Sequence, residues 1–209
     1  MAPIRSAQRS FPLALLMLAG LPLGWGGRAA EKLLHAASPK AEVVLAGGCY
    51  WGVESVFRHV KGISSATSGL ATPAAAGADP APFAEAVRLV YDPAKISYAK
   101  ILDVFFSVAH DPTQRDRQGP DVGTRYRSIV FVQNDSQRAV VRAYIDSLTA
   151  AHAYRRPIVT EIAVLHSFDV MPPDQQDYAE KHPDDPYIVT NDRPKIEALH
   201  QRFPQLYRP

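Results

Sequence analysis

The alternation of apolar and polar residues predicts a series of strands and helices from residue 42 onward. Alternating or continuous apolar runs predict strands at residues 42–46, 84–91, 126–133 and 157–165, and a weaker run predicts one at 63–69. Helices are predicted after residue 49, from the spacing of Val53, Val56, Phe57 and Val60, and at 97–110, 135–154 and 194–203. Ser97 is a predicted N-cap, and the longest helix is capped near Asp135 or Ser136.

The order of these elements indicates a fold class. The middle of the chain reads β-α-β-β-α-β, the split arrangement of a ferredoxin-like α+β sandwich. An extra helix and an extra strand decorate that core. Residues 71–82 are rich in Ala, Gly and Pro and are therefore predicted to form a loop.

The first residues differ from the rest of the chain. A basic start, an apolar stretch over 11–25 and small residues before Ala30 are typical of a secretory signal peptide, here residues 1–29. An uncleaved anchor or a disordered cytoplasmic tail are the alternatives. Residues 30–41 are interpreted as a leader and 42–209 as the domain, in an exported protein that is expected to be periplasmic.

Composition adds few constraints. A chain of 209 residues is long enough for one domain with its own core. The net charge of +2 gives no reason to expect a nucleic acid partner. The chain has one cysteine, so it forms no internal disulfide, and no paired Cys or His spacing predicts a metal site.

That cysteine, Cys49, lies in "GGCYWGVE" at a strand-to-helix junction. Backbone N–H groups at a helix N-terminus carry partial positive charge, which favours the reactive thiolate. The alternative is a buried thiol that acts as a small hydrophobic side chain. The position before a helix and beside Tyr50 and Trp51 favours the reactive interpretation.

Glu85 lies in "AEAVRLVY", on the face that Val87 and Leu89 share. If that face is buried, burial raises the carboxyl pKa and keeps a neutral acid near pH 7. If the strand frays at its start, Glu85 is exposed to solvent. The pattern leaves both readings open.

The polar, turn-rich stretch 110–128 is a candidate binding loop, with Asp121 and Tyr126 as hydrogen-bonding groups, or else an exposed charged loop. A thiolate, a protonated acid and a hydroxyl together suit attack on an atom whose oxygen the acid and hydroxyl polarise. A Cys–His hydrolase has no marked histidine here, and thiol peroxidase chemistry has only the lone thiol in its favour.

Three segments, "GGCYWGVE", "AEAVRLVYDPAKISY" and "HDPTQRDRQGPDVGTRYRS", together resemble the A-type peptide methionine sulfoxide reductases. The hallmark of that family is Gly-Cys-Phe-Trp-Gly followed by Val-Glu. The resemblance runs from about residue 42 to the end of the chain. It implies reduction of (S)-methionine sulfoxide, in proteins or free, through a cysteine sulfenic acid.

The resemblance also implies roles for six residues. The nucleophile falls on Cys49, the acid on Glu85 and the oxygen-binding hydroxyl on Tyr126, while Tyr50 and Trp51 cradle the substrate methyl and Asp121 binds substrate. No bound cofactor or metal is implied. Because the chain lacks a second cysteine, an external thiol reductant is the expected partner beside the oxidised substrate.

Several positions depart from the family pattern. Tyr50 replaces phenylalanine, Leu70 replaces a tyrosine, Pro82-Phe83 replaces Gly-His, and Gln175 stands where histidine is usual. The Asn-Pro-Thr-Tyr segment that supplies a second oxygen-binding tyrosine is missing. These departures support an alternative in which the chain is a weak or inactive relative that acts as a binding or redox-sensing module.

Overall fold

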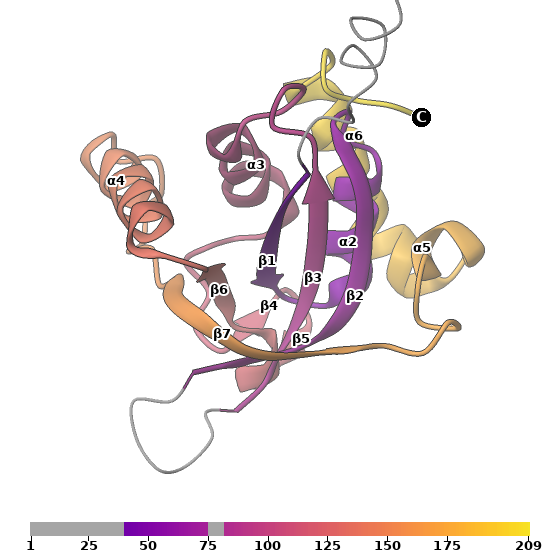
Figure 1. Cartoon of the computed structure of the whole chain (residues 1–209). Helices are drawn as coiled ribbons and strands as arrows, with labels where there is room; N and C mark the ends of the chain where they lie inside the picture. The colour runs from indigo at the N-terminus through magenta and orange to yellow at the C-terminus, as the bar shows by residue number, and fades with distance from the viewer. Residues whose placement is uncertain (1–39, 75–81) are drawn as a thin grey trace, which may run out of the picture. The chain divides into compact units, whose positions relative to one another are not determined.

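The computed structural model describes residues 40–74 and 82–209. Five strands form one sheet that closes into a barrel (Figure 1): β1 (Ala41–Gly47), β2 (Ile63–Pro73), β3 (Ala84–Tyr91), β6 (Ser128–Val132) and β7 (Glu161–Val170). Their order around the barrel is β1-β3-β2-β7-β6, and β6 pairs again with β1. Neighbouring strands are antiparallel except β6 and β7, which are parallel.

The mixed α and β content is as predicted, but the ferredoxin-like sandwich is not. β3 does lie between β1 and β2, as in a split β-α-β unit. The additional strand β7, however, pairs with both β2 and β6 and closes the sheet. Its partner on β2 is Gly69–Pro73, part of which was predicted to be loop. Because residues 71–73 were predicted as loop, their pairing with β7, which closes the sheet, was missed as well.

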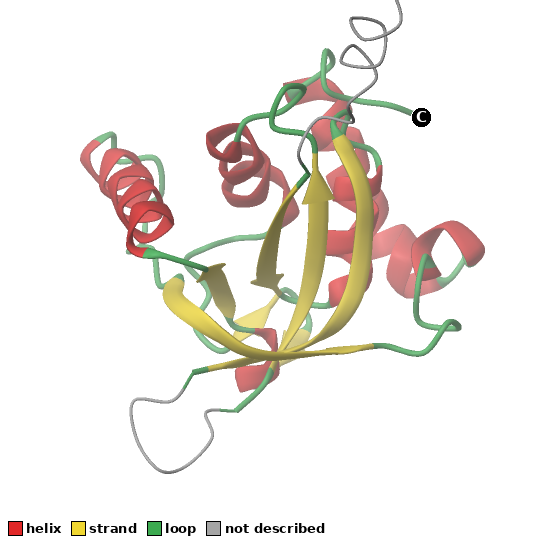
Figure 2. Ribbon diagram, in the orientation of Figure 1, coloured by secondary structure: helices red, strands yellow, loops and turns green. Residues whose placement is uncertain are grey.

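The helices lie outside the barrel (Figure 2). They are α2 (Tyr50–Arg58), α3 (Tyr98–Val104), α4 (Asp135–Ala150), α5 (Tyr178–Lys181) and α6 (Arg193–Arg202). Short π-helical turns cover Phe105–Ala109 and Ile188–Asp192, and a 3-10 turn covers Thr124–Tyr126. The Ser97 cap is confirmed, since its side chain accepts from the Lys100 N–H; the cap of α4 is Asn134 rather than Asp135 or Ser136.

Both faces of β1 are buried, from Val43 to Gly47. Along β1, Val43 and Leu45 join a large core shared with the helices, whereas Val44 and Ala46 join a second cluster made only of strand residues. That second cluster fills the barrel interior. It is rich in alanine, as expected for a barrel whose few strands leave little interior space.

Two further sequence predictions change in detail. β7 begins at Glu161 and ends at Val170, so both of its ends lie several residues later in the chain than those of the strand predicted at 157–165. The loop 110–128 contains a two-stranded hairpin, β4 (Arg117–Gln118) with β5 (Asp121–Val122). The signal peptide and the leader up to residue 39 lie outside the described residues and stay predictions. Within residues 40–74 and 82–209, no helix has the length and apolar character needed to cross a membrane.

Candidate active site

The turn between β1 and α2 presents the cysteine. Gly48 has a φ of +98°, which L side chains rarely adopt, and a Cβ at this position would lie 2.5 Å from the Gln118 side chain. Glycine is therefore required here for both conformation and space. Cys49 follows as the N-cap residue of α2 and remains partly exposed.

The thiol of Cys49 is not the thiolate that the helix position predicted. Burial, and after it the negative charge of Glu85, raise the pKa of the thiol from 9.0 to about 12. The Trp51 backbone N–H and the Tyr187 hydroxyl lower that pKa, but by less. The helix terminus acts in the predicted direction, but burial outweighs it, so Cys49 is protonated at neutral pH.

Glu85 is buried, which settles the open question about the start of β3. The residue is 3% exposed, and its carboxyl accepts a hydrogen bond of 3.2 Å from the Tyr50 backbone N–H. The Arg125 side chain also donates to this carboxyl, from Nε at 3.0 Å and from Nη2. Burial raises the pKa of Glu85, while the hydrogen bonds and charge of Arg125 oppose that rise.

Aromatic rings surround the start of α2. The Trp51 indole stacks on Tyr178 with ring centroids 3.8 Å apart, and it meets Tyr50 and Tyr187 edge-on at 6.2 and 6.0 Å. Tyr50 itself is buried. Two tyrosines from the C-terminal part of the chain therefore join Tyr50 and Trp51 in one aromatic cluster.

The predicted loop residues also reach this site. Asp121 accepts a 2.5 Å hydrogen bond from the hydroxyl of Tyr187, and this hydroxyl lies close enough to Cys49 to lower the pKa of its thiol. Tyr126 lies close enough to Cys49 and Glu85 for their charges, together with burial, to raise the pKa of its phenol. The six predicted site residues therefore lie close together, while other residues of 110–128, such as Arg117 and Val122, are exposed to solvent.

Sequence reasoning missed two residues of the site. Tyr187 lies in the polar stretch "HPDDPY", which has no periodicity that marks a binding residue. Arg125 was read as part of a charged loop, although its position next to Tyr126 is a signal that pointed to the site. Both are brought in by tertiary structure, 40 or more residues from their partners Glu85 and Asp121.

Two residues that depart from the family pattern, Tyr50 and Gln175, contact each other. The extra hydroxyl of Tyr50 donates to Oε1 of Gln175 at 3.3 Å. The Pro82-Phe83 segment is held by Arg127, which donates to the carbonyl oxygens of both residues at 2.7 and 3.1 Å. The Tyr50 and Gln175 substitutions therefore make a specific hydrogen bond with each other, whereas Arg127 contacts only the backbone of Pro82 and Phe83.

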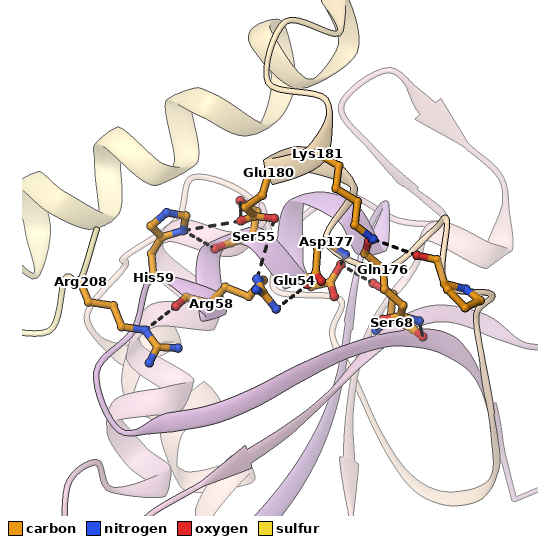
Figure 3. A network of polar contacts seen from close by, with 11 residues as sticks. Glu54, Ser55, Arg58, His59, Ser68, Gln176, Asp177, Glu180, Lys181 and Arg208 are labelled. Atoms are coloured by element: carbon orange, nitrogen blue, oxygen red, sulfur yellow. Dashed lines mark hydrogen bonds and ion pairs between the residues drawn. The ribbon is translucent and has the colours of Figure 1, made fainter.

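A buried polar network fixes α2 from its other side (Figure 3). Oε2 of Glu54 accepts hydrogen bonds of 3.0 Å from the Ser68 hydroxyl and from the Asp177 backbone N–H. Burial raises the pKa of Glu54 to about 7. In the part of the chain that the structure describes, no group of three or more His, Cys, Asp or Glu residues is arranged to hold a metal ion.

Comparisons with known proteins identify the family of this chain. A family model for peptide methionine sulfoxide reductase matches residues 41–206. Peptide methionine sulfoxide reductase MsrA 2 of Mesorhizobium japonicum is 46% identical over 179 residues, covering 82% of this chain and 92% of the relative. MsrA of Natronomonas pharaonis is 43% identical over 170 residues, covering 78% and 95%.

Solved structures of similar proteins give the same result. Mxr1 from Saccharomyces cerevisiae in reduced form aligns with a TM-score of 0.60 at 26% identity, covering 69% of this chain and 87% of that one. Methionine sulfoxide reductase A of Corynebacterium diphtheriae aligns with a TM-score of 0.56 at 29% identity, covering 71% and 77%. The chain belongs to the peptide methionine sulfoxide reductase family.

Proposed function

We propose that this methionine sulfoxide reductase acts on the S epimer through a sulfenic acid on Cys49 and is regenerated by an external thiol. Family membership favours this enzyme over the binding or redox-sensing alternative. The observation that carries the proposal is the convergence of the Cys49 thiol, the buried Glu85 carboxyl and the rings around Trp51.

The reaction transfers one oxygen atom. The Cys49 sulfur attacks the sulfoxide sulfur and forms a transient sulfur–sulfur bond; this bond and the sulfur–oxygen bond of the substrate then break as the oxygen becomes bonded to Cys49. The substrate sulfur gains two electrons as methionine, and the Cys49 sulfur loses two as sulfenic acid. The proton of the thiol ends on the transferred oxygen, so no further proton is consumed.

Glu85 carries that proton between the two atoms. With a pKa of about 12, the Cys49 thiol must lose its proton as it attacks. Protonated Glu85 gives its proton to the sulfoxide oxygen, and the resulting carboxylate accepts the thiol proton. Its charge state is then the same before and after the reaction. Tyr126 donates a hydrogen bond to the same oxygen, and Asp121 together with Tyr187 holds the substrate beside it.

Single-turnover kinetics test this proposal. The protein is mixed with peptides carrying S- or R-methionine sulfoxide, without any reductant, and both methionine and free thiol are followed. One methionine formed and one thiol lost per chain, from the S peptide alone, are expected. Methionine from the R peptide, or methionine without thiol loss, would contradict the assignment. Cys49→Ser, which keeps the shape of the site, is the matched control and is expected to form none.

Regeneration requires a reductant that the chain does not contain. After the first turnover the sulfenic acid must react with an external thiol, because no second cysteine is present. We expect continued turnover in the presence of a dithiol protein or a small thiol. Turnover unaffected by every added thiol would contradict this part of the proposal.

We further propose that the enzyme is exported and repairs oxidised proteins in the periplasm. The support is the basic start and apolar stretch of residues 1–29. Mass spectrometry of the protein from a cell envelope fraction tests it, with a mature N-terminus at residue 30 as the expected result.

A further inference from the structure

Arg125 is an unusual neighbour for a buried catalytic acid. Its Nε lies 3.0 Å from Oε1 of Glu85, and Nη2 donates to the same oxygen. The guanidinium also lies over the Tyr126 ring, 5.2 Å from the centroid. It is therefore a neighbour of both residues assigned to the sulfoxide oxygen, the acid Glu85 and Tyr126.

Few of the N–H donors of the Arg125 guanidinium bond to other groups in the described part of the protein. A guanidinium has five N–H donors, and Glu85 is the one hydrogen-bond acceptor found for Arg125 within residues 40–74 and 82–209. Its side chain is 48% exposed, whereas that of Glu85 is 4% exposed. Arg125 therefore approaches the acid from the solvent side of the site, with most of its donors still free.

A substrate oxygen must approach the same place. To receive a proton, it has to come within hydrogen-bond distance of the Glu85 carboxyl. A guanidinium that already contacts this carboxyl is then a neighbour of the incoming oxygen. We propose that Arg125 is a catalytic residue, whose guanidinium donates a hydrogen bond to the sulfoxide oxygen and takes the part of the missing second tyrosine.

The chemistry suits this role. Negative charge develops on the sulfoxide oxygen as Cys49 attacks, and a fixed cation beside it stabilises the transition state more than the ground state. Arginine stays charged at every pH at which the protein is folded. The inference rests on the proposed oxygen transfer to Cys49 and adds to it the group that replaces the lost hydroxyl.

Single-turnover rates of Arg125→Gln and Arg125→Lys test the proposal in the full chain. The maximal rate of Arg125→Gln should fall by roughly 100-fold, as for the loss of one oxyanion donor, with a smaller change in half-saturation. Arg125→Lys keeps the charge and should recover part of the rate. The matched control is Arg117→Gln in the same loop, because Arg117 is exposed and donates to the Gly119 carbonyl rather than to Glu85. Circular dichroism checks that each variant is folded.

The pH dependence separates contact with the oxygen from an effect through Glu85. Tyr50, Tyr126, Asp121 and Cys49 are the other titratable groups around this carboxyl. Contact with the oxygen lowers the rate of Arg125→Gln at every pH, including those at which Glu85 is protonated in both proteins. A shifted pH midpoint with an unchanged maximal rate would show that Arg125 only positions Glu85, and would overturn the proposal.

The remaining outcomes are also decisive. If Arg125→Gln equals or exceeds the wild-type rate, Arg125 obstructs the site and the proposal is wrong, while the proposed function stands. If the wild-type protein forms no methionine, both the proposed function and this inference fail.

Discussion

At the scale of single residues, the environment of the reactive thiol opposes its ionisation. Burial and the neighbouring Glu85 raise the pKa of Cys49 to about 12, so the free enzyme holds a thiol at neutral pH. A protonated, partly buried thiol reacts slowly with general oxidants and electrophiles, since the thiolate is the nucleophile. Reactivity then depends on a substrate that brings its own oxygen to the acid.

Alkylation kinetics test whether the Cys49 thiol is protonated at neutral pH. Iodoacetamide should modify Cys49 at pH 7 at least roughly 100-fold more slowly than it modifies free cysteine, whose pKa is about 8.5. The rate should keep rising up to pH 10. A rate that levels off near pH 7 would show that the thiol is already ionised there.

The contact between Tyr50 and Gln175 yields a second residue-level prediction. Tyr50→Phe removes a hydrogen bond of 3.3 Å and restores the usual family residue. The free energy of unfolding should change by no more than about 1 kcal/mol, and the single-turnover rate by only a few-fold. Gln175→Ala removes the same bond from the other side and should give a similar result by urea unfolding. A large loss of single-turnover rate in Tyr50→Phe, without a similar loss in Gln175→Ala, would show that the Tyr50 hydroxyl contacts the substrate.

Most of the site was predictable because its residues sit in short, fixed segments. Cys49, Tyr50 and Trp51 are consecutive, and Glu85 lies on a strand whose alternation was clear. The pKa of Cys49 was not predictable, since it depends on burial by distant segments. Arg125 and Tyr187 were missed for the same reason: their contacts with Glu85 and Asp121 exist only in the folded chain.

At the scale of elements, Glu54 ties three segments together. It projects from α2, accepts a hydrogen bond from Ser68 on β2 and another from the backbone of Asp177 just before α5. Oε1 of the same carboxyl has no hydrogen-bond partner within the described residues. An ionised carboxyl with one oxygen unpaired is costly in a buried site, which explains why burial raises its pKa to about 7.

Stability should therefore depend on pH in a defined window. The Glu54 pKa of about 7 in the folded chain exceeds its ordinary value of 4.5, so the folded state holds this proton more tightly. The stabilisation is complete below pH 4.5 and is lost as the pH rises through 7, by at most about 3 kcal/mol. Glu54→Gln should flatten this slope in urea unfolding between pH 4.5 and 8. An unchanged slope would show that another group is responsible.

The element order was easier to predict than the ends of the elements. β3 and α3 were recognised because alternation and the Ser97 cap are local signals. The end of β2 was not, because Ala71, Thr72 and Pro73 have the composition of a loop and are ordered by pairing with β7. Pro73 is tolerated in this strand at an irregular register.

At the scale of the whole molecule, burial is distributed unevenly among the helices. α2 has seven buried residues among nine, whereas α4 has one, Val141, among sixteen. In Figure 1, α4 lies to one side of the barrel and α2 lies against the strands. A helix held by few buried contacts opens at lower free energy than one within the core.

Hydrogen exchange measures this difference. Amide protons of α2 should exchange only through global unfolding, whereas those in the middle of α4 should exchange through local opening with much less protection. The β1 and β3 amides, which belong to strands paired on both sides, serve as the internal reference. Equal protection in α2 and α4 would contradict this distribution of stability.

The closure of the sheet by β7 also affects how the protein can interact with a substrate protein. Each of the five barrel strands has a neighbour on both sides over part of its length, and the stretch 63–67 of β2 is paired with β3 alone, so the unpaired edge of this sheet is short. An exposed edge can template the addition of a strand from another chain and lead to aggregation. Oxidised proteins are often partly unfolded and offer such strands. A repair enzyme with a closed sheet can bind one methionine side chain of such a client without recruiting its backbone.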